Sequence, residues 1–214
     1  MDRTITVKGS AKLSLRPDYV VVTLSLTVED PSYDAAMSQS NARLESLRDA
    51  IAAVGFDRKD LKTTNFRVST EYDFQNDQFG NGRRVFRGYA CTHELKLSLD
   101  FDAARLGETL SAITGCEATP ELNVRFTVKD SDAVSDELLR QASDNALRRA
   151  RVLADASGVT LGQLVRVWYS WGDREFVSPT AFAAGGMLRS KASMDFTPED
   201  IDVNDQATFV WEIL

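Results

Sequence analysis

The side chains best suited to chemistry in this sequence are one histidine and two cysteines. His93 is the only histidine in 214 residues, Cys91 lies two positions before it, and Cys116 is distant. A zinc site needs three or four ligands, and these residues offer no recognisable ligand spacing. A general base needs reach to a substrate and a partner that orients it, whereas His93 alternates with apolar residues and is read as a packed structural histidine. The sequence therefore predicts no catalytic residues, no metal site and no cofactor.

Two common catalytic motifs are also missing or misplaced. The sequence has no Gly-x-Ser-x-Gly nucleophile elbow. Gly80 and Gly82 lie at a predicted hairpin tip rather than between a strand and a helix, so they indicate a turn and not a phosphate-binding loop.

Two other stretches favour contact with another molecule. The first is the one basic and aromatic cluster, which contains Phe79, Arg83, Arg84, Phe86, Arg87 and Tyr89. It is either a solvated hairpin or a contact to an acidic surface, such as a neighbouring copy of this net-acidic protein. The second is the segment 178–194, which shows no clean period and is either a disordered linker or a segment that is buried on association. Its candidate contact residues are Phe182, Met187 and Leu188.

Charge and hydropathy limit the partners and the location. The net charge of −7 argues against a nucleic-acid partner, because phosphate binding needs basic clusters. No stretch approaches the roughly 20 apolar residues of a transmembrane segment. The first residues enter a strand pattern directly, so the sequence as it stands predicts a cytoplasmic protein, or an exported, periplasmic one if a leader was removed.

Alternating and striped hydrophobic patterns predict the elements that position these residues. Val20, Val22, Leu24, Leu26 and Val28 recur at every second position, which is typical of a strand with one buried face. Further alternating strands are expected at 4–15, 66–74, 89–99, 122–128, 164–171 and 207–213. Helices are expected to begin at Asp30-Pro31, Asp102 and Asp130, and glycines at 55, 115 and 158 end them.

The element order predicts an α+β fold with a mainly antiparallel sheet and three helices packed on one face, in βαββ-type units. Arg16-Pro17-Asp18 is expected to be a tight turn that places strand 20–28 antiparallel to strand 4–15. Gly9 is expected to be a bulge or a close-contact site. The alanine-rich face of the third helix predicts that this helix sits close to a sheet.

An ordered set of short motifs resembles the SIMPL domain family, also called domain of unknown function DUF541. The motifs include Ile5-Thr6-Val7-Lys8-Gly9, Arg16-Pro17-Asp18, Val54-Gly55-Phe56, Gly88-Tyr89, Lys129-Asp130-Ser131 and Leu161-Gly162. The family includes bacterial periplasmic, stress-associated proteins. The resemblance implies an α+β fold and, in some members, ring-like homo-oligomers, and it implies no catalytic residues.

Three functional hypotheses follow. The first is a single SIMPL-like domain over 1–214, with sub-units 1–100 and 101–214 as an option and a mobile loop at about 178–194. It would act as a non-enzymatic homo-oligomeric assembly or protein-interaction module, with a part in stress response or signalling. The alternative is a small-molecule-binding protein or enzyme that uses a sheet-side pocket near His93 or Trp168. The third is an adaptor whose 71–88 hairpin docks a protein partner.

Overall fold

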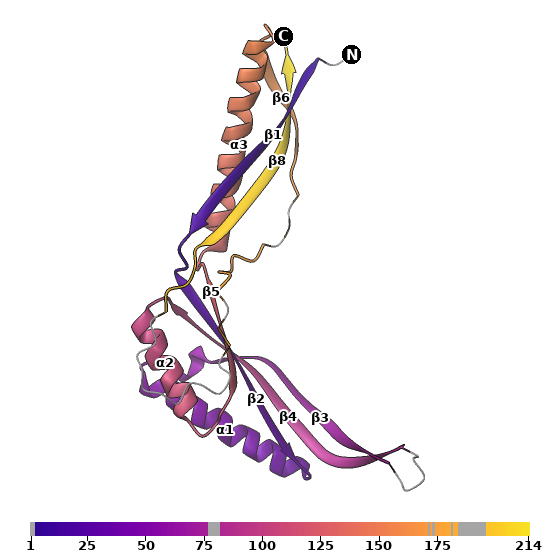
Figure 1. Cartoon of the computed structure of the whole chain (residues 1–214), viewed down its shortest axis with the longest axis vertical. Coiled ribbons are helices and arrows are strands. Elements are labelled where there is room, and N and C mark those ends of the chain that lie inside the picture. The colour runs from indigo at the N-terminus through magenta and orange to yellow at the C-terminus, as the bar shows by residue number, and fades with distance from the viewer. Residues whose placement is uncertain (1–2, 77–81, 171, 173, 181, 184–195) are drawn as a thin grey trace. The chain divides into compact units, whose positions relative to one another are not determined.

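A computed structural model describes the chain except for residues 1–2, 77–81, 171, 173, 181 and 184–195 (Figure 1). The elements follow in the order β1 (Thr4–Leu15), β2 (Tyr19–Asp30), α1 (Tyr33–Ala53), the short 3-10 helix η1 (Arg58–Asp60), β3 (Lys62–Asn76), β4 (Gly82–Asp100), α2 (Ala103–Gly115), β5 (Glu121–Thr127), α3 (Ser131–Ala156), β6 (Leu161–Trp168), β7 (Phe182–Ala183) and β8 (Ile201–Ile213).

The chain divides into two compact units, each assembled from segments that are distant in the sequence. Unit 1 contains residues 1–18, 127–179 and 198–214. Unit 2 contains residues 19–126 and 180–197.

In unit 1 a three-stranded antiparallel sheet packs against α3. The strand order is β1-β8-β6, and β1 pairs with β8 without a break from Thr4–Glu212 to Leu15–Ile201 (Figure 1). Alternate residues of β1 and part of β8 bury their side chains under α3, whereas β6 has no fully buried residue. The buried apolar residues of this unit include Val7, Ala11, Leu138, Ala142, Ala146, Ala150, Phe176, Ile201, Ala207, Phe209 and Trp211.

The close contact predicted at Gly9 is confirmed. A Cβ atom on Gly9 would lie 2.0 Å from the carbonyl oxygen of Ala142 and 2.7 Å from the Cβ of Ala146. The register of β1 with β8 is continuous here, so Gly9 is a close-contact site and not a bulge. The alanine face of α3 therefore sits directly on the backbone of β1.

The tight turn predicted at Arg16-Pro17-Asp18 does not join β1 and β2 as neighbouring antiparallel strands of one sheet. β1 pairs with β8, and β2 lies between β4 and β5. The reason lies at Asp18, whose amide donates to the carbonyl of Thr127 (3.1 Å) and whose carboxylate accepts from the amide of Lys129 (2.8 Å). These bonds fix the Arg16-Pro17-Asp18 segment to the connection between β5 and α3, so the segment does not close a hairpin.

Unit 2 contains the sheet with strand order β3-β4-β2-β5-β7, and α1 packs along β2 and β4 (Figure 1). The alternation predicted in β2 is confirmed, because the five alternating residues are all buried, with at most 3% of their surface exposed: Val20, Val22, Leu24, Leu26 and Val28. Four of them, Val20, Val22, Leu24 and Leu26, form one core with residues of α1, β4, α2 and β5, which include Leu44, Leu47, Ile51, Leu95, Leu97, Leu106, Leu110, Ile113, Val124 and Phe126.

Two of the three predicted helix starts are confirmed by side-chain caps. Asp102 accepts a hydrogen bond from the amide of Arg105 (2.8 Å), and Asp130 accepts one from the amide of Ala133 (2.9 Å). α1 begins two residues later than predicted, with Ser32 as its N-cap residue. Asp30 instead accepts from the amide of Ser32 (2.8 Å), which fixes the chain as it leaves β2.

The α+β class with antiparallel strands is confirmed. The expectation that three helices cover one sheet needs correction, since α3 packs on the sheet of unit 1 and α1 on the sheet of unit 2. None of the helices in the described part of the chain combines the length and apolar character needed to cross a bilayer.

Candidate interaction surface

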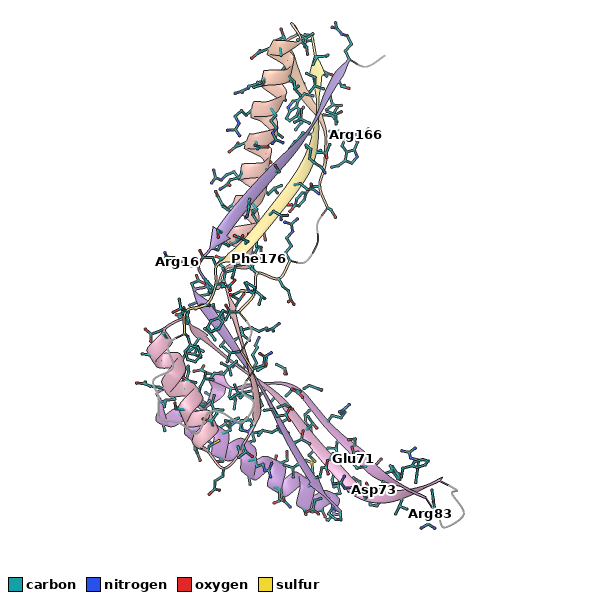
Figure 2. All side chains as sticks on the ribbon, viewed as in Figure 1. Arg16, Glu71, Asp73, Arg83, Arg166 and Phe176 are labelled. Atoms are coloured by element: carbon teal, nitrogen blue, oxygen red, sulfur yellow. The ribbon has the colours of Figure 1, made fainter. Side chains whose placement is uncertain are left out.

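The β3–β4 hairpin of unit 2 extends past the end of β2 as a two-stranded ribbon. β2 pairs with β4 only from Tyr89 to Asp100, so residues 82–88 of β4 pair with β3 alone. Figure 2 marks Glu71, Asp73 and Arg83 along this ribbon. Here the edge of β4 therefore lacks the partner strand that β2 provides in the rest of the sheet, and the side chains at 72–74, 83, 84, 86 and 87 are exposed.

A bulge at Arg87 sets the direction of the side chains on this ribbon. Glu71 pairs with Gly88, but Tyr72 pairs with Phe86, so Arg87 is an extra residue in β4. An extra residue shifts the alternation of side chains by one position. Phe86 and Tyr89 thus lie on one face, with ring centroids 5.3 Å apart.

Four aromatic rings follow one another from α1 onto the ribbon. The ring centroids are 5.5 Å apart for Tyr33–Tyr89, 5.3 Å for Tyr89–Phe86 and 5.8 Å for Phe86–Tyr72, and all three pairs meet edge to face. We call Tyr33, Tyr89, Phe86 and Tyr72 the aromatic row. Phe86 is 47% exposed and Tyr72 is 44% exposed, and nearby Phe74 is 73% exposed. Contiguous apolar surface of this kind marks interaction sites.

The structure brings the predicted arginines next to this row. The guanidinium of Arg84 lies 4.6 Å from the centre of the Tyr72 ring. Arg87 is 3.0 Å from a carboxylate oxygen of Glu29 and 3.9 Å from one of Asp73. Arg83 pairs with Gln75 near the end of the ribbon and is exposed. The hairpin therefore presents positive charge beside exposed aromatic rings.

Gly88 is required where the ribbon meets the rest of the sheet. Its φ is +155°, and a Cβ there would lie 2.5 Å from the carbonyl oxygen of Asp30. Any side chain at this position would push the end of β2 away from β4.

The remaining predicted contact residues are only partly described. Phe79, Met187 and Leu188 lie outside the described residues. Phe182 lies in β7, where its backbone pairs with Val124 of β5.

Sequence reasoning missed a second exposed apolar surface, on β6 of unit 1. Within the described chain β6 is an edge strand that pairs only with β8. Leu164, Val165, Val167 and Trp168 are each 43–52% exposed, and the guanidinium of Arg166 lies 5.3 Å from the Trp168 ring (Figure 2). The sequence could have indicated this surface, because apolar residues occupy both even and odd positions of β6, so both faces of the strand are apolar. Edge strands with exposed apolar side chains can pair with another chain.

The sequence of the chain also matches the profile of a known protein family. The sequence profile of SIMPL, described as "Protein of unknown function (DUF541)", matches residues 5–211. The chain belongs to the SIMPL family. The resemblance inferred from the sequence motifs is thereby confirmed.

Three relatives add detail to this SIMPL assignment. The 26 kDa periplasmic immunogenic proteins of Brucella melitensis and Brucella abortus are each 28% identical to the chain over 166 residues, which is 76% of this chain and 65% of the relative. The uncharacterized protein YggE of Edwardsiella ictaluri is 22% identical over 211 residues, or 98% of this chain and 86% of the relative. The alignment thus covers less than two thirds of the length of the Brucella relatives.

His93 of this SIMPL chain is buried on β4 and is only 7% exposed. Its ring meets Phe66 edge-on at 4.4 Å, and neither ring nitrogen has a hydrogen-bond partner among the described residues. Burial lowers the pKa of the His93 imidazole, and the positive charge of Arg48 on α1 lowers it further. A general base would need an orienting partner and access to substrate, and these contacts supply neither.

Acid is therefore expected to destabilise unit 2 through His93. In the unfolded chain a histidine binds a proton below about pH 6.5, whereas the folded site stays neutral to lower pH. The unfolded state then binds more protons, so the free energy of unfolding falls as pH decreases from about 6.5. For one proton the slope is at most about 1.4 kcal/mol per pH unit. Urea unfolding followed by far-UV circular dichroism between pH 7.5 and 5 measures it.

The variant His93→Leu is the control for this pH dependence. Leucine fills the buried position with an apolar side chain of similar size and removes the only imidazole in the chain. Its free energy of unfolding is expected to vary less with pH over the same range. Equal slopes in the two proteins would contradict the assignment to His93.

In unit 1 a cluster of polar side chains surrounds the buried carboxylate of Asp205. Asp205 of β8 has 1% of its side chain exposed and accepts hydrogen bonds from the Tyr169 hydroxyl (2.7 Å) and the Arg174 guanidinium (2.5 Å). The hydrogen bond to Asp205 is the largest cause of the raised pKa of Tyr169. Tyr169 and Arg174 also line a cavity of about 480 Å³ that Asp132 and Asp136 of α3 border. The cluster fixes the chain after β6 onto β8, which is a structural role.

Proposed function

We propose that this SIMPL chain is a non-enzymatic, homo-oligomeric assembly or protein-interaction module. The observation that carries the proposal is the aromatic row with the exposed Phe74 and the adjacent arginines on a two-stranded ribbon. Aromatic residues and arginine are enriched in the centres of protein interfaces.

The ribbon itself supports a contact with another protein surface. A two-stranded hairpin alone is marginally stable in water, so residues 82–88 gain stability when another surface covers them. The protein carries a net charge of −7, so a second copy offers acidic surface to Arg83 and Arg84. The exposed edge of β6 supplies a second surface of the same kind in unit 1.

The names of the relatives support a periplasmic location. Both Brucella relatives are named periplasmic proteins, and we infer the same compartment for this chain. These names give no support to the cytoplasmic location expected from the sequence. A part in stress response or signalling belongs to the same proposal and derives from the family resemblance.

The alternative, a small-molecule site or active site near His93, is less well supported. The His93 ring is buried against Phe66, and the described residues place no carboxylate or hydroxyl in hydrogen-bond contact with it. These contacts around His93 give the alternative less support than the exposed aromatic row gives to an interaction module.

The double variant Phe74→Ser, Phe86→Ser is expected to weaken self-association at least tenfold. Losing two exposed aromatic side chains removes contact area from the centre of the proposed interface. Both residues are about half exposed or more in the single chain, so the fold is expected to survive. Size-exclusion chromatography with light scattering, over a concentration series, measures the effect.

The matched control is Val152→Ser on α3 of unit 1, which removes a 62% exposed apolar side chain that is not part of the ribbon. The control is expected to assemble like the unmodified protein. A protein that stays monomeric at every concentration, or a double variant that assembles normally, would contradict the proposal.

A further inference from the structure

The face of α1 that packs on β4 brings two sulfur atoms together. The thiol of Cys91 lies 3.6 Å from the thioether sulfur of Met37, which comes from a helix 54 positions earlier in the chain. Cys91 is fully buried and Met37 is partly exposed. Both sulfurs therefore lie between α1 and β4, with Met37 on the side that solvent can reach.

His93 lies on the same face of β4 as Cys91, two positions further along the strand. Both side chains are buried, whereas Thr92 between them is more exposed, as the alternation of a strand requires. Both nitrogens of His93 and the hydroxyl of Ser40, on the buried face of α1, are buried without a hydrogen-bond partner among the described residues. Unsatisfied buried polar atoms are rare and call for a physical reason.

We propose that Met37, Cys91 and His93 form a binding site for a monovalent soft metal ion, Cu(I). Thiolate and thioether ligands select Cu(I), and imidazole also suits copper. With the zinc–thiolate bond length of about 2.3 Å as a guide, two sulfurs bound to one ion lie at most about 4.6 Å apart, and the observed separation of 3.6 Å is within this limit. The proposal goes beyond the assembly function and does not depend on it.

The charge balance favours a monovalent ion. On binding, the S–H bond of Cys91 breaks, a sulfur–copper bond forms and the proton leaves to solvent. One thiolate and one Cu(I) together are neutral. A neutral pair suits this apolar position, because Cys91 pairs with Val28 of β2 on one side and with Val68 of β3 on the other. A divalent ion would leave a net positive charge near Arg48, and buried charge without a partner is costly.

The protonation states of two of the three ligands agree with this role. The lowered pKa of His93 keeps its imidazole neutral, so a nitrogen lone pair is available to a metal ion. Burial raises the pKa of the Cys91 thiol, so Cys91 stays protonated until a metal ion displaces the proton. In the described part of the chain, His, Cys, Asp and Glu side chains by themselves form no group of three or more that could hold a metal ion. The proposed site needs Met37 as a ligand. Met37 and Cys91 are 54 positions apart, so no short sequence motif would reveal the site.

The test is an anaerobic titration of the full chain with Cu(I) against the chromophoric competitor bicinchoninate. The unmodified protein is expected to bind one Cu(I), to release about one proton per ion, and to show sulfur and nitrogen ligands in copper X-ray absorption. Met37→Leu is expected to weaken binding at least tenfold, and Cys91→Ser at least 100-fold. Met37→Leu is close in volume at a partly exposed helix position, so its fold is expected to be unchanged in circular dichroism.

Cys116→Ser is the matched control, because it removes the other cysteine, whose thiol lies 3.1 Å from the carbonyl oxygen of Ile113. It is expected to bind Cu(I) as the unmodified protein does. Unchanged affinity in Met37→Leu, loss of binding in Cys116→Ser, or no competition with bicinchoninate at all would each overturn the proposal.

Discussion

Replacing Gly9 with alanine is expected to lower the free energy of unfolding of unit 1 by about 3 kcal/mol. The added methyl group would lie 2.0 Å from the carbonyl oxygen of Ala142, a backbone atom that no rotamer change can move. Relief requires α3 to move away from β1, and that movement opens the packing of Ala146 on the sheet. A clash against backbone is therefore transmitted along the whole helix.

Tryptophan fluorescence during urea unfolding measures this loss selectively. The three tryptophans of the chain, at positions 168, 171 and 211, all fall within the segments of unit 1. Gly115→Ala in α2 is the control, because a Cβ there meets no atom within 4 Å and alanine is the better helix former. Equal unfolding midpoints for Gly9→Ala and the unmodified protein would show that α3 does not pack on β1 as described.

Replacing Asp205 with alanine is expected to destabilise unit 1 by about 2–3 kcal/mol. The change removes the buried acceptor of the Tyr169 hydroxyl and the carboxylate partner of the Arg174 guanidinium. Arg174 is one third exposed, so water replaces part of the loss and the effect stays below that of a fully buried pair. The chain after β6 should lose its attachment to β8 at the same time.

Asp202→Ala provides the control in the same strand. Asp202 is 60% exposed and pairs with the exposed Lys12 at 3.3 Å, so its removal is expected to change stability far less than removal of Asp205. Hydrogen–deuterium exchange of residues 169–176 should rise in Asp205→Ala and stay unchanged in Asp202→Ala. Equal effects of the two variants would contradict a buried anchoring role for Asp205.

The candidate interaction surface was only partly predictable. Arg83, Arg84 and Phe86 were identified from composition, because arginine and aromatic residues are common in interfaces. Tyr33, Tyr72 and Phe74 were missed as contact residues, since their grouping with Phe86 depends on the bulge at Arg87 and on the position of α1. Sequence alternation alone places Phe86 and Tyr89 on opposite faces, and the bulge places them together.

The amino-acid sequence by itself determined the features that depend on neighbours along the chain. The buried face of β2, the caps at Asp102 and Asp130, and the close contact at Gly9 follow from side-chain period, local hydrogen bonding and side-chain size. Membership of the SIMPL family was also readable from ordered short motifs.

Only the tertiary structure decided which elements lie side by side. β1 pairs with β8 from the opposite end of the chain, and Met37 meets Cys91 across a helix–sheet interface. A two-residue period in the sequence predicts which side chains of a strand are buried. The same period is compatible with any neighbouring strand, so it does not predict which strand is the partner. That selection depends on long-range contacts, such as α3 packed on Gly9 and Asp18 bonded to Thr127 and Lys129.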